Sequence, residues 1–252
     1  MSDPGAAILA LPLGNVLDSF SGAFDFIFSQ RISEQGGDLQ VGGLGQIGEL
    51  LLSQTLISVV ALLIALVIAM PIGVYLGHRG VGEFLAVAVG NAGRAVPELA
   101  LIALMVAFVG VGAVNVTIAV MILGIPPILT NSYVGIRQVD RGAVEAARGI
   151  GMTEWEIIRR VELPLAVPTI MGGVRTGAVN IVATSTIGSI AGVDTFGKLI
   201  LGDAIYGTEG VIAGAIMVAL LALAFEFALA GIQRLLTPRG VRVQRHAARL
   251  AV

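Results

Sequence analysis

Residues 140–164 read DRGAVEAARGIGMTEWEIIRRVELP, a charged segment that separates two long apolar stretches of the chain. Asp140 stands where it can cap a helix, and Gly151 favours a break after that helix. Thr153 and Glu156 have the spacing of a capping box, which marks the start of a second helix. The pattern predicts two short, well-capped helices joined by a tight turn.

The second of these helices is expected to end at Leu163 and Pro164, where the proline would mark the start of a membrane span. Two short, rigid helices between spans are typical of a surface on which another protein docks. An interfacial helix pair that only anchors the loop at the membrane surface is an equal alternative. The residue pattern by itself leaves both interpretations open.

The composition places the chain in a membrane. Of its 252 residues, 56% are hydrophobic and 13% are charged, and the mean hydropathy is +0.93. So few polar residues cannot coat a water-facing surface. The net charge of −2 offers no basic field for nucleic acid, and the lack of cysteine excludes disulfides and thiolate metal sites. His78 and His246 have no metal-ligand spacing, so no metal site is expected.

Four apolar stretches predict five membrane spans. A hydrocarbon core about 30 Å thick needs roughly 20 helical residues. Residues 99–136 are too many for one span, so they are expected to fold back at 110–115, with the first half extending back through Pro97. The other spans fall at 50–77, 163–193 and 210–233. The predicted fold class is an all-α integral membrane protein whose permease domain covers residues 49–236.

The positive charges predict the orientation. Twelve arginines lie in the stretches that join spans one to two and three to four, or that follow span five, against Arg31 and Lys198 on the other side. Cytoplasmic loops carry the excess of lysine and arginine. The segment 1–48 is therefore expected outside, and the loop 137–163 and the basic tail 237–252 in the cytoplasm.

Part of the external segment has a helical pattern of its own. Phe20, Phe24, Ile27 and Phe28 recur at helical spacing, which predicts an amphipathic helix at the outer membrane interface. An additional membrane span is the alternative. The glycines of residues 35–43 predict a flexible connector to the first core span.

One motif in the cytoplasmic loop is specific. Fixed residue types follow the spacing EAA-x3-G-x9-I-x-LP, with valine in place of the usual isoleucine, and they are Glu145, Ala146, Ala147, Gly151, Val161, Leu163 and Pro164. This pattern resembles the EAA signature of binding-protein-dependent ABC importer permeases. The motif lies on the side that the charge placement independently assigns to the cytoplasm.

The resemblance extends over about residues 46–240 and implies the type I ABC importer permease fold in the bacterial cytoplasmic (inner) membrane. It implies that the loop is a coupling helix in a groove of an ATP-hydrolysing subunit. The implied coupling residues are Glu145, Ala146, Ala147, Gly151, Thr153, Trp155, Leu163 and Pro164. The implied partners are a dimer of ABC ATPase subunits that holds ATP and Mg, a second permease copy or paralogue, an external solute-binding protein and membrane lipid.

Other segments resemble the branch of that family that imports osmoprotectants, such as glycine betaine, choline, carnitine or proline betaine. They are residues 91–97, 110–112, 126–136, 161–166 and 172–176, with Asn180, Thr184 and Ile187. Two features depart from the branch: Glu98 replaces a small polar residue, and residues 191–198 replace a glycine-rich segment. Other small solutes, such as methionine or ergothioneine, therefore stay open as alternatives.

Charged side chains inside a bilayer are costly and need an explanation. Arg94 and Glu98 are four residues apart and are expected to pair on one helix face near the cytoplasmic end, with a gate as the alternative. Arg175 is expected to pair with Glu98 or with Glu226. Structural ion pairs are the preferred interpretation of all four residues.

A group of smaller polar residues raises a different possibility. Asn180 and Thr184 share a helix face, with Ser185 and Ser189 beside it. These residues, together with Glu98, either line the translocation path or make hydrogen bonds between helices. Aromatic residues make up only 5% of the chain, too few for a cage around a quaternary ammonium. High-affinity recognition is therefore expected on the external binding protein.

Two other classes of function compete less well. The chain has no G-x4-G-K-[ST] phosphate loop, so ATP hydrolysis is expected on a partner and no catalytic site in this chain. An ion-coupled secondary transporter would need coupling-ion residues and often has inverted repeats, which the sequence lacks. A membrane-embedded enzyme has no HExxH or GxSxG motif to support it.

Overall fold

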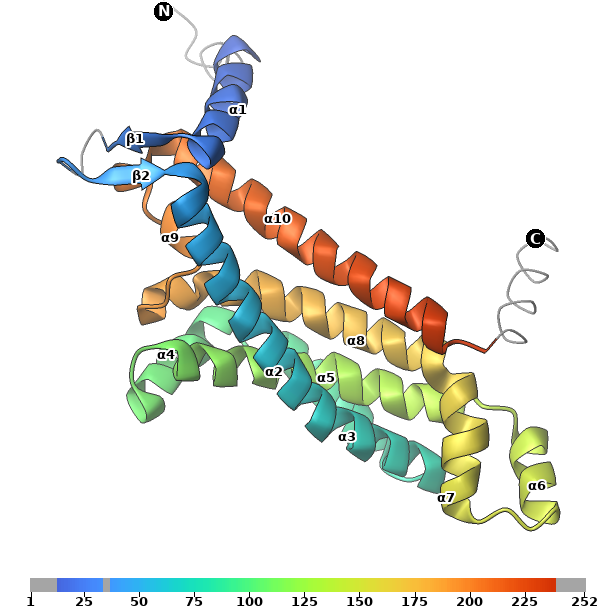
Figure 1. The fold of residues 1–252 in the computed structure, drawn as a ribbon. Coiled ribbons are helices and arrows are strands. Elements are labelled where there is room, and N and C mark those ends of the chain that lie inside the picture. The colour runs from blue at the N-terminus through green and yellow to red at the C-terminus, as the bar shows by residue number, and fades with distance from the viewer. Residues whose placement is uncertain (1–12, 34–36, 239–252) are drawn as a thin grey trace, which may run out of the picture.

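The computed structural model describes residues 13–33 and 37–238, and within them it leaves out the side chains of 13–17, Ala92 and Arg94. Almost all of the expected basic tail, 237–252, lies outside the described residues. The described part is a helical bundle with one small two-stranded sheet (Figure 1).

The elements follow one another in an order close to that predicted. The outer segment holds α1 (Leu13–Phe28), β1 (Gln30–Ile32) and β2 (Gln40–Gly42). The bundle follows with α2 (Gly43–Arg79), α3 (Glu83–Ala95), α4 (Glu98–Val109) and α5 (Ala113–Arg137). The loop comprises α6 (Arg141–Gly149), α7 (Glu154–Ile157) and a π-helical turn (Ile158–Glu162). The chain ends with α8 (Leu163–Ser185), a 3₁₀ turn (Thr186–Ala191), α9 (Gly197–Ile200) and α10 (Asp203–Leu236).

The expected flexible connector before the first core span is partly ordered. Strands β1 and β2 pair antiparallel, with Gln30 opposite Gly42 and Ile32 opposite Gln40. Gly42 and Gly43 have φ of 81° and 80°, a left-handed conformation that suits glycine and turns the strand into α2. The prediction missed the hairpin because three-residue strands leave no periodic pattern.

Four helical stretches among the described residues are long and apolar enough to cross a membrane: Gly43–Arg79, Ala113–Arg137, Glu154–Ala191 and Asp203–Leu236. The remaining expected span is divided into α3 and the shorter apolar α4. Pro97 causes the break, because proline has no N–H and holds the preceding residue away from helical geometry. The predicted fold-back is confirmed: Gly110 and Gly112, with φ of 85° and 120°, separate α4 from α5.

The expectation that the loop helix ends at Pro164 is wrong. Helix α7 continues through the π-helical turn into α8 without a break. The Leu163 N–H donates to the carbonyl of Ile158, five residues back rather than four. This wider turn carries the helix past Pro164. Proline is tolerated in the first turn of α8 because the N–H that it lacks needs no helical partner at that position.

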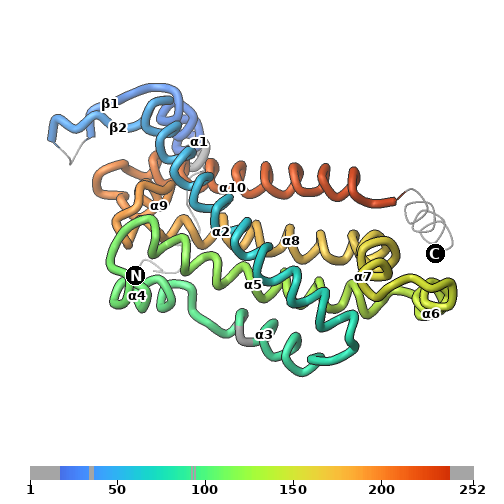
Figure 2. The backbone as a smooth tube through the Cα atoms, turned by 60° about the horizontal axis from the view of Figure 1, so that its bottom comes forward, coloured from blue at the N-terminus to red at the C-terminus, as the bar shows by residue number. Residues whose placement is uncertain are grey.

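The centre of the bundle is α5, which contacts both α2 and α8 (Figures 1 and 2). Glycines allow the backbones to touch. A Cβ added to Gly73 would lie 2.6 Å from the Leu129 carbonyl oxygen, and one added to Gly173 would lie 2.5 Å from the Pro127 carbonyl oxygen. Such distances exclude any side chain, so these helices pack through small residues, as membrane helices commonly do.

A single buried amide joins the outer ends of three elements. The fully buried Gln54 of α2 donates to the Val182 carbonyl at 3.1 Å and to the Thr186 hydroxyl at 2.9 Å. Its side-chain oxygen accepts the Phe196 N–H at 3.0 Å. Residues 191–198, the segment that departs from the osmoprotectant branch, are therefore anchored to α2 by a hydrogen bond that the sequence did not predict.

Two adjacent glycines of α8 provide a matched test of this packing. Gly173→Ala is expected to lower the free energy of unfolding by about 1–3 kcal/mol, because the new methyl group meets backbone atoms of α5. Gly172 has nothing within 4 Å of an added Cβ, so Gly172→Ala is expected to be neutral or up to about 1 kcal/mol stabilising. Denaturant unfolding of the purified protein in detergent measures both, and equal effects would contradict the packing model.

Candidate functional site

The loop that follows α5 begins with a capped helix, as predicted. The Asp140 carboxylate accepts the Gly142 N–H at 3.1 Å, which satisfies one of the free donors at the start of α6. Val144 and Ala147 are buried, so the face of α6 that carries them packs into the hydrophobic core. The helix ends at Gly149, two residues before Gly151, at which the sequence predicted a break.

The chain then reverses and starts α7. Gly151 has φ of 88° and nothing within 4 Å of an added Cβ, so its backbone conformation rather than a lack of space favours glycine. Thr153 and Glu156 form the predicted capping box. The Glu156 N–H donates to the Thr153 hydroxyl, and the Thr153 N–H donates to the Glu156 carboxylate at 3.1 Å.

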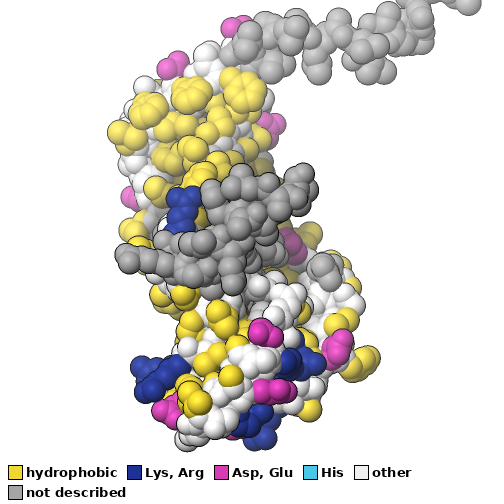
Figure 3. Space-filling view, turned by 90° about the vertical axis from the view of Figure 1, so that its right-hand side faces the viewer, with side chains coloured by type: hydrophobic (Ala, Val, Ile, Leu, Met, Phe, Trp, Pro, Cys, Tyr) yellow, Lys and Arg dark blue, Asp and Glu magenta, His cyan; other side chains and the backbone are white. Residues whose placement is uncertain are grey.

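The predicted coupling residues differ in how exposed their side chains are. Among the predicted coupling residues, those exposed to solvent are Glu145, Ala146, Gly151, Thr153 and Trp155. Ala147 is buried and belongs to the hydrophobic core that also contains Ile157 and Ile158, while Leu163 and Pro164 are half-buried. The alanine thus allows close packing within the loop, and the exposed residues form a surface that another protein can contact. Charged side chains gather at this end of the molecule (Figure 3).

One exposed residue of this surface was not predicted. Ile150 is 80% exposed and Trp155 is 67% exposed, an unusual state for large apolar side chains at the membrane surface. Ile150 occupies a variable position of the motif, so spacing could not identify it. An apolar residue between two glycines at a turn was the available signal.

An ion pair holds the two helices of the loop together. The Arg148 guanidinium donates to both oxygens of the Glu154 carboxylate at 3.0 Å. The bidentate hydrogen bond to Glu154 raises the pKa of Arg148. Both side chains are exposed, so the pair fixes geometry more than it adds stability.

His78 ties the loop to α2. Its Nδ1 lies 2.7 Å from Oε2 of Glu162, and its Nε2 lies 3.1 Å from Oε2 of Glu154. The His78 and Glu162 side chains are only 8% and 2% exposed. The sequence gives no sign of these contacts, because His78 lies far from the loop in the chain.

A cavity of about 780 Å³ lies between α2 and the loop. Its walls include His78, Arg79 and Tyr75 of α2 and Glu154 and Trp155 of α7. The Arg79 guanidinium lies 5.6 Å from the centre of the Tyr75 ring. The loop therefore contacts α2 through the contacts of His78 with Glu154 and Glu162, which we call the His78 clamp. An open cavity remains beside these contacts.

The predicted path residues do not share one surface. Thr184 and Ser185 are buried, and the Ser185 hydroxyl lies 3.3 Å from that of Ser58 on α2. Ser189 is half-buried in the 3₁₀ turn, which changes the helical register. Asn180 is exposed on α8, as Glu98 is on α4. Ser185 therefore makes a hydrogen bond between helices, one of the two roles expected for this group.

Of the expected ion pairs, Arg175 with Glu226 is present. The Arg175 guanidinium pairs with the Glu226 carboxylate and also donates to the Gln233 side-chain oxygen at 3.1 Å, which joins α8 to α10. Arg94 and Glu98 do not share a helix, because α3 ends at Ala95 and α4 begins at Glu98. The side chain of Arg94 lies outside the described residues.

A bundle of membrane-length helices with a rigid, capped loop at one end defines an integral membrane transport permease. The chain belongs to the family described as "Binding-protein-dependent transport system inner membrane component", whose model matches residues 69–241. The resemblance seen in the EAA motif is thus confirmed. The chain is the multi-pass permease subunit of an ABC transport system, and its role is transport rather than catalysis.

Several relatives share about a third of their residues with this chain. The "Glycine betaine/carnitine/choline transport system permease protein OpuCB" of Bacillus subtilis (strain 168) is 36% identical over 74% of this chain and 86% of its own length. The "Choline transport system permease protein OpuBB" of the same strain is 37% identical over the same shares. The "Osmoprotectant import permease protein OsmW" of Salmonella typhimurium (strain LT2) is 34% identical over 71% of this chain and 86% of its own length.

A solved structure shares the fold. A chain of the MetNI methionine ABC transporter in inward-facing conformations superposes with a TM-score of 0.68 and 20% identity, over 77% of this chain and 98% of that chain. At this identity the likeness shows the fold alone. This chain therefore shares its fold with a chain of a known ABC transporter.

The clamp on the loop generates a prediction for stability. His78→Ala is expected to lower the free energy of unfolding by about 1–3 kcal/mol, because Glu162 stays buried after it loses its partner. Trp155 is the only tryptophan and lines the same cavity, so its fluorescence reports thermal release of the loop. Adding Glu162→Gln is expected to recover part of the loss, because a neutral amide is less costly to bury.

The exposed contact between Arg160 and Glu156, at 3.5 Å, offers the control for this experiment. Arg160→Ala is expected to change stability by less than about 0.5 kcal/mol. A His78→Ala variant that melts like Arg160→Ala would contradict the clamp.

Proposed function

We propose that this chain is the permease of an ATP-driven importer for small zwitterionic or quaternary ammonium osmoprotectants of the glycine betaine, choline and carnitine type. The printed names of relatives at 34–37% identity support this solute class. The observation that carries the transport role is the loop, which is capped, clamped to α2 and exposes Glu145, Ala146 and Gly151 of the EAA motif.

In this proposal five core spans cross the membrane: α2, the broken pair α3–α4, α5, α8 and α10. The N-terminus and segment 1–48 lie outside, and the loop 137–163 and the C-terminus lie in the cytoplasm, as the arginine distribution favours. Five spans enclose only half a pathway. A second copy of the chain, or a paralogue, completes it and covers the exposed apolar faces of α4 and α10.

The loop receives its motion from a partner. Two ABC ATPase subunits dock on residues 140–163, and they hold ATP and Mg while this chain binds no cofactor. Closure of the ATPase pair moves both loops together and shifts the bundle from inward-facing to outward-facing. The His78 clamp passes that movement to α2, and the continuous helix through Pro164 passes it to α8.

Solute reaches the pathway from an external binding protein. The exposed Asn180 and Glu98 are the predicted path residues that a solute can meet, whereas Thr184 and Ser185 are buried and Ser189 is half-buried. No aromatic cage is expected in the chain, so the path binds its solute weakly and the binding protein supplies recognition. Methionine and ergothioneine are the alternative solutes, and an ion-coupled secondary transporter is the alternative class.

The docking surface is tested by charge reversal and by a bulky side chain. Glu145→Arg and Gly151→Trp are expected to weaken ATPase association at least about tenfold and to abolish uptake, because both change the exposed face of the loop. Membrane insertion is expected to stay intact. Glu83→Arg, the same reversal at an exposed position of α3, is the control and is expected to retain the ATPase. Normal co-purification of the ATPase with both loop variants would contradict the proposal.

The solute class is tested by competition in vesicles that contain the permease, the ATPase and the binding protein. Unlabelled choline and carnitine are expected to reduce uptake of labelled glycine betaine, and methionine and ergothioneine are expected to have no effect. If only methionine or ergothioneine competed, that compound and not an osmoprotectant would be the transported solute. Solute movement by the permease alone, driven by an ion gradient without nucleotide, would overturn the class of transporter.

A further inference from the structure

Helix α1 has three chemically different faces. The exposed large hydrophobic side chains described on it are Phe20, Phe24 and Phe28, which are 46%, 55% and 64% exposed. Their spacing of four residues makes one aromatic stripe along the helix. Asp18 and Asp25 are exposed at helical positions about 100° around from that stripe.

The third face of α1 packs against the bundle. Ala23 and Phe26 are fully buried, and the Phe26 ring meets the Tyr206 ring edge-on at 6.4 Å. A Cβ added to Gly22 would lie 2.8 Å from the Glu209 side chain, so α1 approaches α10 closely. Ile27, which the sequence grouped with the interfacial phenylalanines, is buried and belongs to this packing face.

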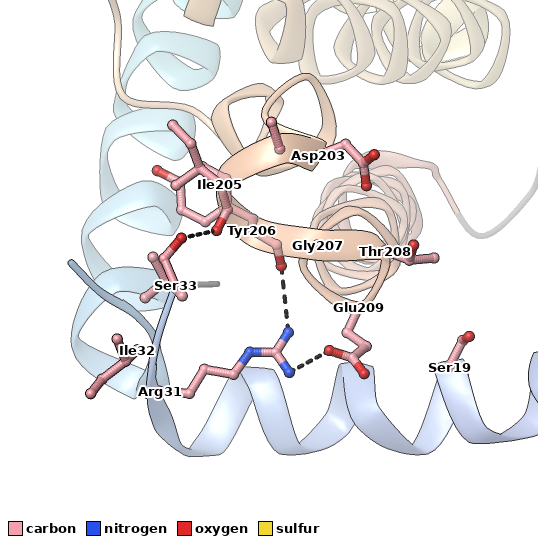
Figure 4. Close-up of a pocket in the computed structure, with 12 residues that line it drawn as sticks. Ser19, Arg31, Ile32, Ser33, Asp203, Ile205, Tyr206, Gly207, Thr208 and Glu209 are labelled. Atoms are coloured by element: carbon pink, nitrogen blue, oxygen red, sulfur yellow. Dashed lines mark hydrogen bonds and ion pairs between the residues drawn. The ribbon is translucent and has the colours of Figure 1, made fainter. Parts of the chain in front are cut away.

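Polar contacts fix how α1 is rotated. Figure 4 shows the Arg31 guanidinium between the Glu209 carboxylate and the Tyr206 carbonyl oxygen, which lies 3.4 Å away. The same guanidinium lies 4.8 Å from the centre of the Phe26 ring. The Ser33 hydroxyl donates to the Ile205 carbonyl at 2.7 Å. These contacts surround a cavity of about 570 Å³ and join α1 and the hairpin to the start of α10.

The fixed rotation points the stripe in a definite direction. Helix α1 lies at the end of the bundle opposite the loop and runs across the long direction of α5 and α8 (Figures 1 and 2). Figure 3 views the molecule from the end that carries α6 and α7, and hydrophobic side chains form a row over α1 facing that viewer. The aromatic stripe therefore faces back along the bundle, toward the region that the membrane-length helices cross.

We propose that α1 lies flat on the outer leaflet of the membrane, with Phe20, Phe24 and Phe28 inserted among the lipids and Asp18 and Asp25 in water. An apolar stripe beside a charged, polar face is the pattern of a helix at a membrane interface. The 16 residues of α1 span about 24 Å, short of a hydrocarbon core about 30 Å thick, so an additional span is disfavoured. A protein that docks from outside would meet the opposite face of α1.

This inference rests on the proposed sidedness of the chain and not on its solute or its ATPase. The chain has no cysteine, so single cysteines can be introduced for spin labels without other changes. Phe24→Cys places a label on the stripe, and Asp25→Cys places one on the next residue, which faces water in the proposal. Phe28→Cys is a second position on the stripe and replaces Phe24→Cys if that variant does not fold.

The labelled permease is reconstituted in vesicles of phosphatidylethanolamine and phosphatidylglycerol without nucleotide or solute. Power saturation then compares collisions with oxygen, which concentrates in lipid, and with a water-soluble nickel chelate. The ratio of oxygen to nickel accessibility is expected to be several times higher at 24 and 28 than at 25. Equal ratios would overturn the proposal, and so would a stripe position closed to both reagents, because protein rather than lipid would then cover it.

Discussion

The close contact of α5 with α2 and α8 is the constraint on which the rest of the bundle depends. In a bilayer, lipid is as apolar as a leucine side chain, so burial of apolar surface does not drive helices together. Gly73 and Gly77 on one side of α5, and Gly173 on the other, let backbones meet where any side chain would clash. These contacts fix the spacing of the three helices to which the loop 140–162 is attached.

The loop is attached to that same triad at two points. His78 follows directly after Gly77, whose added Cβ would lie 2.8 Å from the Tyr133 carbonyl of α5, so the clamp sits beside a backbone contact. Glu162, its buried partner, ends the π-helical turn that runs into α8. The loop is therefore joined to α2 by the His78 contacts and to α8 by a continuous helix, and both helices pack closely against α5.

The sequence predicted what depends on neighbouring residues and missed what depends on distant ones. The Asp140 cap, the capping box at Thr153 and the break at Gly110 are local, and the structure confirms them. The clamp by His78 and the hydrogen bonds of Gln54 join residues far apart in the chain, so no spacing rule finds them. The expected end at Pro164 failed because a π-helical turn, which has no sequence signature, carries the helix onward.

The hydrogen-bonding groups of several polar residues inside the bundle are engaged with other residues of the chain. Gln54 and Ser185 use their hydrogen-bonding groups to hold α2, α8 and the outer turns together, so they have little left to offer a solute. The Arg175 and Glu226 charges neutralise each other between α8 and α10. Of the residues considered for the path, Asn180 and Glu98 keep exposed polar groups, and they lie on outward faces of α8 and α4. A solute site built from them needs a second subunit opposite these faces, which is the arrangement that the proposed importer requires.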